Sequence, residues 1–242
     1  MFSLLSLLKS FFTHIVDFIY PRICNHCQST IDTSHKIFCS ACLQSLSLVN
    51  KQGRCSRCLV YLEDDFSIYC ETCALKPHYF TELAATFEYQ GLAKTLWREI
   101  QSPGGEEWIE TAASFMVMQM IQLGYPIPDL VIPVPVNKKG LLFSKKSIKQ
   151  LLAEKIATNL GCKYVDPLYA VSYFSQKGKN RLERMQLSSD MFTWRKRVSF
   201  CGKKILIVDD MMVSAATMHA VADKVQEGLP MQIYGISFCV QI

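Results

Sequence analysis

Four Cys-x-x-Cys pairs near the start of this 242-residue chain constrain its fold more than any other feature. They are Cys24/Cys27, Cys39/Cys42, Cys55/Cys58 and Cys70/Cys73, with eleven or twelve residues between consecutive pairs. A Cys-x-x-Cys pair places two sulfurs on one tight turn, and tetrahedral zinc takes four thiolates at about 2.3 Å. Successive pairs therefore predict two structural zinc ions, one held by the first two pairs and one by the last two.

Several alternatives to that pairing stay open from the sequence. The pairs can interleave, form disulfides or hold an iron–sulfur cluster, although the regular spacing favours zinc in a reducing compartment. A closed four-thiolate site leaves no position for water, so no catalysis is expected there. The remaining cysteines, Cys162, Cys201 and Cys239, lie in apolar stretches and are expected to be buried.

The first 20 residues have the spacing of an amphipathic helix. Apolar residues from Leu4 to Ile19 share one face, and Pro21 ends the pattern. No basic segment precedes the apolar run, which argues against a signal peptide, and the run is too short to span a bilayer. We expect this helix to pack on the protein itself. The alternatives are contact with a membrane surface or with a partner protein. The predicted location of the protein is the cytoplasm, and the alternative location is the inner face of the membrane.

From residue 81 onward the pattern alternates between helix and strand. Helices are expected over 91–101, 106–123, 147–160 and 214–226, and strands over 130–132, 204–208 and 232–240. Strands without polar alternation, separated by helices, predict an α/β fold with a parallel sheet covered by helices on both faces. Ligands of such sheets bind at the carboxyl ends of the strands. The loops after Ile132 and Val208 lie at those ends.

The segment after Val208 carries the candidate chemistry. Asp209 and Asp210 follow a buried strand and precede a short loop and a helix. The two carboxylates can accept hydrogen bonds from ribose hydroxyls, and the loop and the helix N-terminus can hold a phosphate. The alternative is that the two acids only cap the helix.

These features together resemble the ComF-type competence proteins, a phosphoribosyltransferase-like family linked to DNA uptake. The matching parts are the four Cys pairs, the Ile132-Pro133-Val134-Pro135 strand end and Leu206-Ile207-Val208-Asp209-Asp210 before a helix, and they span nearly the whole chain. The resemblance implies a type I phosphoribosyltransferase fold over 81–242, after an amphipathic helix over 1–21 and a double zinc ribbon over 22–80. It also implies a site for phosphoribosyl pyrophosphate at Asp209, Asp210, Ser214 and Thr217.

This chain departs from the family motif inside that site. The family has Thr-Thr-Gly-Ala-Thr two residues after the acids, and here Val213 and Ala215 replace the first threonine and the glycine. Glycine tolerates positive φ and lets the backbone approach phosphate, and a Cβ opposes both. Lys145 and Lys146 fall in a segment where the family has Arg-Gly-Phe-Asn-Gln. We therefore expect a degenerate site with weak or absent phosphoribosyl pyrophosphate binding and little or no transferase activity.

Charge distribution suggests a second kind of ligand. Residues 138–155 carry six lysines and one acid, residues 177–204 carry nine basic residues and two acids, and the whole chain has a net charge of only +5. Cations beside aromatic rings suit single-stranded nucleic acid, whose phosphates pair with the cations while its bases stack. The candidate contacts are Lys145, Lys146, Lys177, Lys179, Arg181, Arg184, Trp194, Arg195, Lys196 and Arg197. The alternative is a solvated basic surface with aromatic rings in the core.

Three functions follow from the sequence. The first is a ComF-like protein that handles single-stranded DNA in the cytoplasm during DNA uptake, alone or with a DNA-uptake protein partner. The second is a phosphoribosyltransferase that acts on a nucleobase or a related acceptor. The third is a zinc-ribbon adaptor that docks to a protein or a membrane surface. The basic and aromatic stretches favour the first.

Overall fold

A computed structural model describes residues 21–31, 37–64, 66–75, 77–136, 146–171, 189–195 and 198–241. The amphipathic helix expected over 1–21 lies outside the described residues apart from Pro21. Seven of the basic candidates also lie outside them: Lys145, Lys177, Lys179, Arg181, Arg184, Lys196 and Arg197. Within the described ranges, no helix has the length and apolar character needed to cross a membrane.

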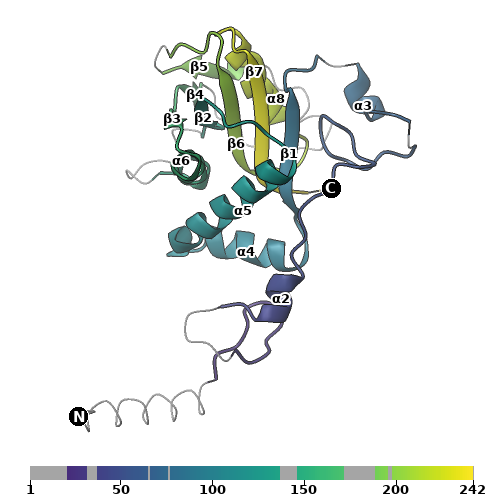
Figure 1. Cartoon of the computed structure of the whole chain (residues 1–242), viewed down its shortest axis with the longest axis vertical. Coiled ribbons are helices and arrows are strands. Elements are labelled where there is room, and N and C mark those ends of the chain that lie inside the picture. The colour runs from purple at the N-terminus through teal and green to yellow at the C-terminus, as the bar shows by residue number, and fades with distance from the viewer. Residues whose placement is uncertain are drawn as a thin grey trace, which may run out of the picture.

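Five parallel strands form the central sheet in the order β1-β7-β6-β2-β3 (Figure 1). They are β1 (Glu82–Glu88), β7 (Gln232–Val240), β6 (Lys204–Met212), β2 (Leu130–Pro133) and β3 (Lys163–Tyr164). A separate antiparallel pair joins β4 (Leu168–Ala170) to β5 (Phe192–Trp194). Nearly every residue of β7, β6 and β2 is buried, as expected for strands covered on both faces. The predicted parallel α/β fold is confirmed.

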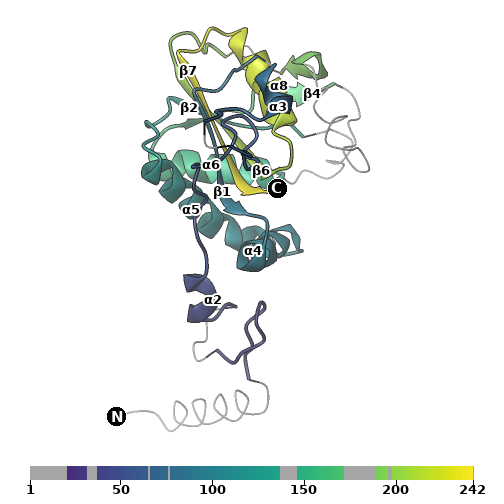
Figure 2. The ribbon, with the colours of Figure 1, turned by 90° about the vertical axis from the view of Figure 1, so that its right-hand side faces the viewer.

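Helices cover both faces of this sheet (Figures 1 and 2). On one face lie α4 (Gly91–Gln101), α5 (Ile109–Gln122) and α6 (Ile148–Leu160), and on the other lies α8 (Ala216–Gln226). The core splits accordingly. Met116 and Ile156 pack with Leu206 on the first face, while Met218 and Val221 pack with Ile207 on the second.

The ends of α6 show why the sequence predicted this helix so closely. The Ser147 hydroxyl accepts the Gln150 backbone N–H, and the Gln150 side chain accepts the Ser147 N–H, which forms a capping box. Gly161 ends the helix in the left-handed conformation, at φ 66°. Both ends of α6 are therefore determined by local sequence, the first by the capping box and the second by Gly161.

Other boundaries differ from the prediction. Strand β6 continues through both acids to Met212, because β7 pairs with it up to Val240. The helix expected over 106–123 divides into a 3-10 turn, η1 (Gly105–Trp108), and α5. Helix α8 begins at Ala216 instead of residue 214. The sequence did not predict β1, the short β3, β4 and β5, or the 3-10 turn η3 (Ser189–Met191). The prediction of three buried cysteines is confirmed only for Cys239, because Cys162 is half-buried and Cys201 lies exposed in a turn.

The two cysteine ribbons pack on opposite faces of the sheet. The first, with α2 (Ser40–Gln44), lies against α4 at one end of the molecule (Figures 1 and 2). The Asn25 amide donates to Glu99 at 3.1 Å, and the Phe38 and Trp108 rings lie 6.0 Å apart. The second ribbon, with α3 (Glu71–Ala74), shares the core of the α8 face. Each ribbon is thus built into a different half of the hydrophobic core.

Candidate functional site

The acid pair at the end of β6 is closed by a lysine from α6. The Lys149 ammonium lies 2.6 Å from Asp209 Oδ1 and 3.5 Å from Asp210 Oδ1. Asp209 Oδ1 also accepts the Asp210 backbone N–H, and Asp210 Oδ2 accepts the Gln101 amide at 3.3 Å. Strand β6, helix α6 and helix α4 therefore supply one network in which both carboxylates have protein partners.

Burial governs the charges in this network. It raises the pKa of the Asp209 carboxyl to about 6, against the opposing pull of the Lys149 ammonium. For Lys149 burial alone would lower the pKa, but the attraction of Asp209 and Asp210 outweighs burial and holds it above the usual lysine value. The lysine is therefore held as a cation against the acids.

The position of Lys149 shows that residues 138–155 do not form the uniformly basic surface that the sequence predicted. Its charge was counted toward a basic surface with only one acid nearby, whereas it is directed at Asp209 and Asp210. Lys155 in the same stretch pairs with Glu110 of α5 at 2.9 Å. The local count missed both pairings because the acids come from distant parts of the sequence.

The loop between β6 and α8 keeps a left-handed residue at the position of the family's glycine. Ala215 has φ 55° and ψ 0°, is buried and immediately precedes α8. The sequence argument expected its Cβ to oppose positive φ, yet the alanine adopts it. Ser214 is buried beside it, and Thr217 is half-buried in the first turn of α8. Thus all four predicted phosphoribosyl-site residues lie on one strand–loop–helix segment.

Replacing Ala215 by glycine is expected to stabilise the protein by about 1 kcal/mol, because glycine adopts this conformation without the steric cost of a Cβ. Ala220 in the interior of α8 is the matched control, and its replacement by glycine should destabilise by about 0.5–1 kcal/mol. The midpoints of urea unfolding measure both changes. Equal destabilisation by the two substitutions would show that Ala215 is not strained.

Both cysteine clusters have the dimensions of tetrahedral metal sites. All ligand sulfurs in each cluster lie within 4.8 Å of one another. Cys24 and Cys42 are 3.7 Å apart, Cys27 and Cys39 3.6 Å, and Cys58 and Cys70 3.7 Å. Four thiolates at about 2.3 Å from one ion would be about 3.8 Å apart, and a disulfide would need about 2.05 Å. The residues therefore fit two structural zinc ions, and the predicted pairing of successive Cys pairs is confirmed.

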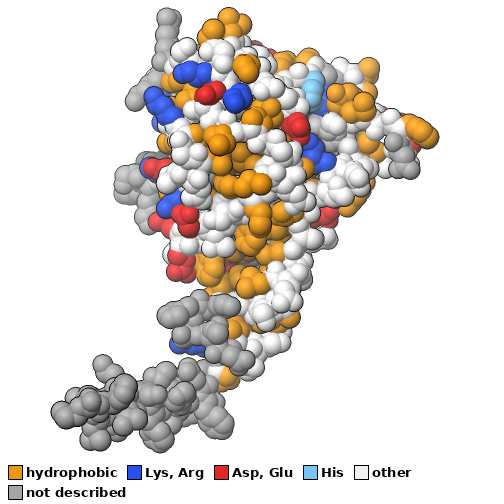
Figure 3. Space-filling model, in the orientation of Figure 1, with side chains coloured by type: hydrophobic (Ala, Val, Ile, Leu, Met, Phe, Trp, Pro, Cys, Tyr) orange, Lys and Arg blue, Asp and Glu red, His pale blue; other side chains and the backbone are white. Residues whose placement is uncertain are grey.

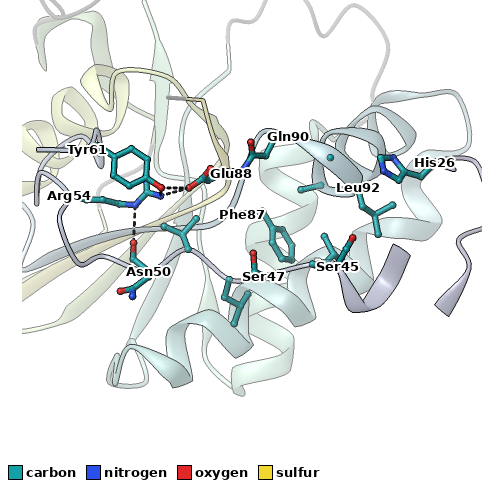
Figure 4. Close-up of a pocket in the computed structure, with 15 residues that line it drawn as sticks. His26, Ser45, Ser47, Asn50, Arg54, Tyr61, Phe87, Glu88, Gln90 and Leu92 are labelled. Carbon is teal, nitrogen blue, oxygen red and sulfur yellow. Dashed lines mark hydrogen bonds and ion pairs between the residues drawn. The ribbon is translucent and has the colours of Figure 1, made fainter. Parts of the chain in front are cut away.

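A polar groove of about 560 Å³ lies away from the acid pair, between the first ribbon, the following linker and the amino end of α4 (Figure 4). At one end the Arg54 guanidinium pairs with Glu88, contacts Tyr61 and donates to the Asn50 carbonyl oxygen at 2.9 Å (Figure 4). This groove was not predicted, because its walls come from short segments that carry no sequence motif.

The described candidates for DNA contact have protein partners. Lys146 pairs with Glu154, and the Arg195 guanidinium lies 3.1 Å from Asp166. Trp194 is half-buried, donates to Glu227 at 2.9 Å and packs 5.4 Å from the Phe200 ring. Cations and acids alternate over the β4–β5 end of the face in Figure 3. The nucleic-acid surface thus stays a prediction, since most of its residues lie outside the described part.

Two protein-family models match this chain, one over the cysteine ribbons and one over most of the sheet domain. A model described as double zinc ribbon domain matches residues 15–74, and one described as phosphoribosyl transferase domain matches residues 103–236. The second match covers more than half of the chain. The chain belongs to the phosphoribosyl transferase domain family. A zinc ribbon region joined to this domain fits a ComF-type protein.

Two curated relatives share parts of this family member's sequence. DNA utilization protein YhgH of Salmonella typhi is 20% identical over 84% of this chain and 89% of its own length. An adenine phosphoribosyltransferase of Thermosynechococcus vestitus is 28% identical over 44% of this chain, and the match spans only 56% of that enzyme. The match to the DNA utilization protein therefore extends over both domains of this chain. The match to the adenine phosphoribosyltransferase covers only part of this chain and part of that enzyme.

Among solved structures, the chain is similar to a purine phosphoribosyltransferase from Pyrococcus horikoshii. The sequence identity is 14%, the TM-score is 0.37, and the match covers 55% of this chain and 73% of that chain. It is also similar to an adenine phosphoribosyltransferase from Saccharomyces cerevisiae, with 14% identity and a TM-score of 0.38 over 59% of this chain and 72% of that chain.

Proposed function

We propose that this protein is a ComF-like protein that handles single-stranded DNA in the cytoplasm during DNA uptake, and that its phosphoribosyl site is degenerate. The observation that carries the proposal is the likeness to a protein named for DNA utilization, which spans 84% of this chain and includes both the ribbon and the sheet domain. The fold alone does not choose this function, because phosphoribosyltransferase-like sheets occur in enzymes as well.

The state of the acid pair supports the second half of the proposal. A transferase of this fold needs carboxylates that are free to accept hydrogen bonds from the ribose. Here Asp209 is buried and paired with Lys149, and Asp210 accepts from Gln101. Transferase activity is therefore the weaker candidate, although Ala215 favours it by adopting a left-handed conformation, which the glycine of the family motif tolerates at this position.

The adaptor function has one observation in its favour. The second ribbon exposes apolar side chains, with Phe66 96% and Leu75 95% exposed. Exposed apolar groups of this size suit a protein contact. An adaptor role and DNA handling are compatible, since a DNA-uptake partner could use this ribbon while the basic stretches contact the strand.

The DNA contact is tested by removing the cations and the ring at the end of β5. Replacing Arg195, Lys196 and Arg197 by alanine should weaken binding to a single-stranded oligonucleotide and flatten its salt dependence, because fewer counterions are released. Trp194→Ala should cost about 1–3 kcal/mol of binding if a base stacks on the ring, and Trp194→Phe should retain most of the affinity. Fluorescence anisotropy at several salt concentrations measures each change.

A charge-matched variant supplies the control. Replacing Lys51, Lys94 and Arg98 by alanine removes three cations that lie outside both basic stretches. This variant should bind single-stranded DNA nearly as well as the unmodified protein. Equal losses in both triple variants would mean that only net charge matters. Unchanged affinity in the 195–197 variant would move the adaptor function ahead.

A further inference from the structure

Lys149 occupies an unfavourable position for a lysine unless the acids hold it there. It is the second residue of α6, where the helix dipole and the unpaired N–H groups present partial positive charge. Its side chain is only 23% exposed, while those of Asp209 and Asp210 are 5% and 16% exposed. A buried cation at a helix N-terminus is stabilised only by strong local anions, so the lysine and the acid pair depend on each other.

The neighbouring lysines show that this placement is specific. Lys146 and Lys155 come from the same region and are half-exposed, and each pairs with a single surface glutamate. Lys149 instead reaches inward to two carboxylates at the carboxyl end of β6. The same helix therefore provides both the feature and its matched control.

The pairing changes what the site can accept. A ribose diol is neutral and binds carboxylates by donating two hydrogen bonds. To reach Asp209 it must displace an ammonium that already satisfies the carboxylate at 2.6 Å, and the displaced ammonium must find water or another anion. Breaking a buried ion pair from one side is costly, because it leaves an uncompensated charge. The ribose hydroxyls carry no charge, so their hydrogen bonds to the carboxylates cannot repay that cost.

We propose that Lys149 determines the specificity of this site, acting as an internal counter-ion that takes the place of ribose hydroxyls on Asp209 and Asp210 and excludes ribose phosphates. This inference rests on the proposed function, in which the site does not bind phosphoribosyl pyrophosphate productively. It adds a cause that is independent of Ala215 and Val213. The apparent affinity for the ligand equals the intrinsic affinity multiplied by the fraction of molecules in which the lysine has left the acids.

Calorimetric titration with phosphoribosyl pyrophosphate and Mg²⁺ tests the proposal, with Mg²⁺ alone as the blank. Lys149→Ala should bind at least about tenfold more tightly than the unmodified protein, which corresponds to a closed state favoured by at least about tenfold. Lys149→Arg keeps a cation against the acids and should remain closed. Lys155→Ala removes a lysine of the same helix without touching the acids, and it should leave the affinity unchanged.

A second variant keeps the test decisive if Lys149→Ala does not fold. Lys149→Ser leaves a hydroxyl and room for water beside Asp209, and it should also gain affinity. If a folded Lys149→Ala or Lys149→Ser protein binds no more tightly than the unmodified one, the inference is wrong while the proposed function stands. Tight binding by the unmodified protein would overturn both the inference and the degenerate site. DNA binding is measured separately and can fail alone.

Discussion

Replacing Cys55 by serine is expected to remove one zinc ion per chain and to destabilise the sheet domain together with the second ribbon. Cys55, Cys58 and Cys73 are buried and share a hydrophobic core with Phe80 and Met218. Structural zinc contributes about 10–16 kcal/mol of apparent binding free energy in small zinc-binding peptides. Loss of that ion therefore disorders a ribbon that forms part of the α8 face.

Cys24→Ser is the matched comparison. It should also remove one zinc ion, but it should leave the second ribbon loaded, because the two clusters use separate cysteines. We expect its thermal melting temperature to fall less than that of Cys55→Ser. Elemental analysis and thermal unfolding measure both effects. Less than one zinc ion per unmodified chain, or iron in its place, would contradict the assignment.

Replacing Arg54 by methionine is expected to destabilise the protein by about 3 kcal/mol, the lower end of the cost of removing one partner from a buried ion pair, because the guanidinium is buried while the Glu88 carboxylate is 27% exposed. The Arg54 side chain is 3% exposed, pairs with Glu88 and stacks on the Tyr61 ring at 3.8 Å. It also donates to the Asn50 and Leu59 carbonyl oxygens. Its loss thus leaves several acceptors without a donor between the second ribbon and β1.

Lys51→Met provides the control for this loss. Lys51 pairs with Glu82 on the same strand, but both side chains are partly exposed, at 27% and 41%. Exposed pairs contribute only about 0–1 kcal/mol. Urea unfolding of the two variants should therefore differ by at least about 2 kcal/mol. Similar unfolding midpoints would show that Arg54 does not hold the ribbon to the sheet.

The sequence predicted those parts of the molecule that local patterns encode. The helical pattern over 147–160 placed α6 to within one residue, and Ser147, Gln150 and Gly161 cap that helix in the structure. The spacing of the cysteine pairs gave the correct grouping of ligands. Short strands such as β3 were missed, because two residues carry too little periodicity to be recognised.

Two features of the candidate site could not be predicted, each for a different reason. The pairing of Lys149 with Asp209 joins α6 to β6, so only the packed sheet brings these groups together. Ala215 was expected to resist positive φ on local grounds. The conformation is accepted because the residues that follow begin α8, whose apolar face, including Met218 and Val221, is buried in the core. Tertiary packing overrides the local preference in that case.

The salt dependence of single-stranded DNA binding tests the central claim most directly. For the unmodified protein, the logarithm of the association constant should fall steeply and linearly with the logarithm of salt concentration, by roughly 0.7 for each phosphate neutralised. Oligonucleotides of different sequence should give similar slopes. Absence of binding at low salt, or an affinity that does not change with salt, would contradict a role in handling single-stranded DNA.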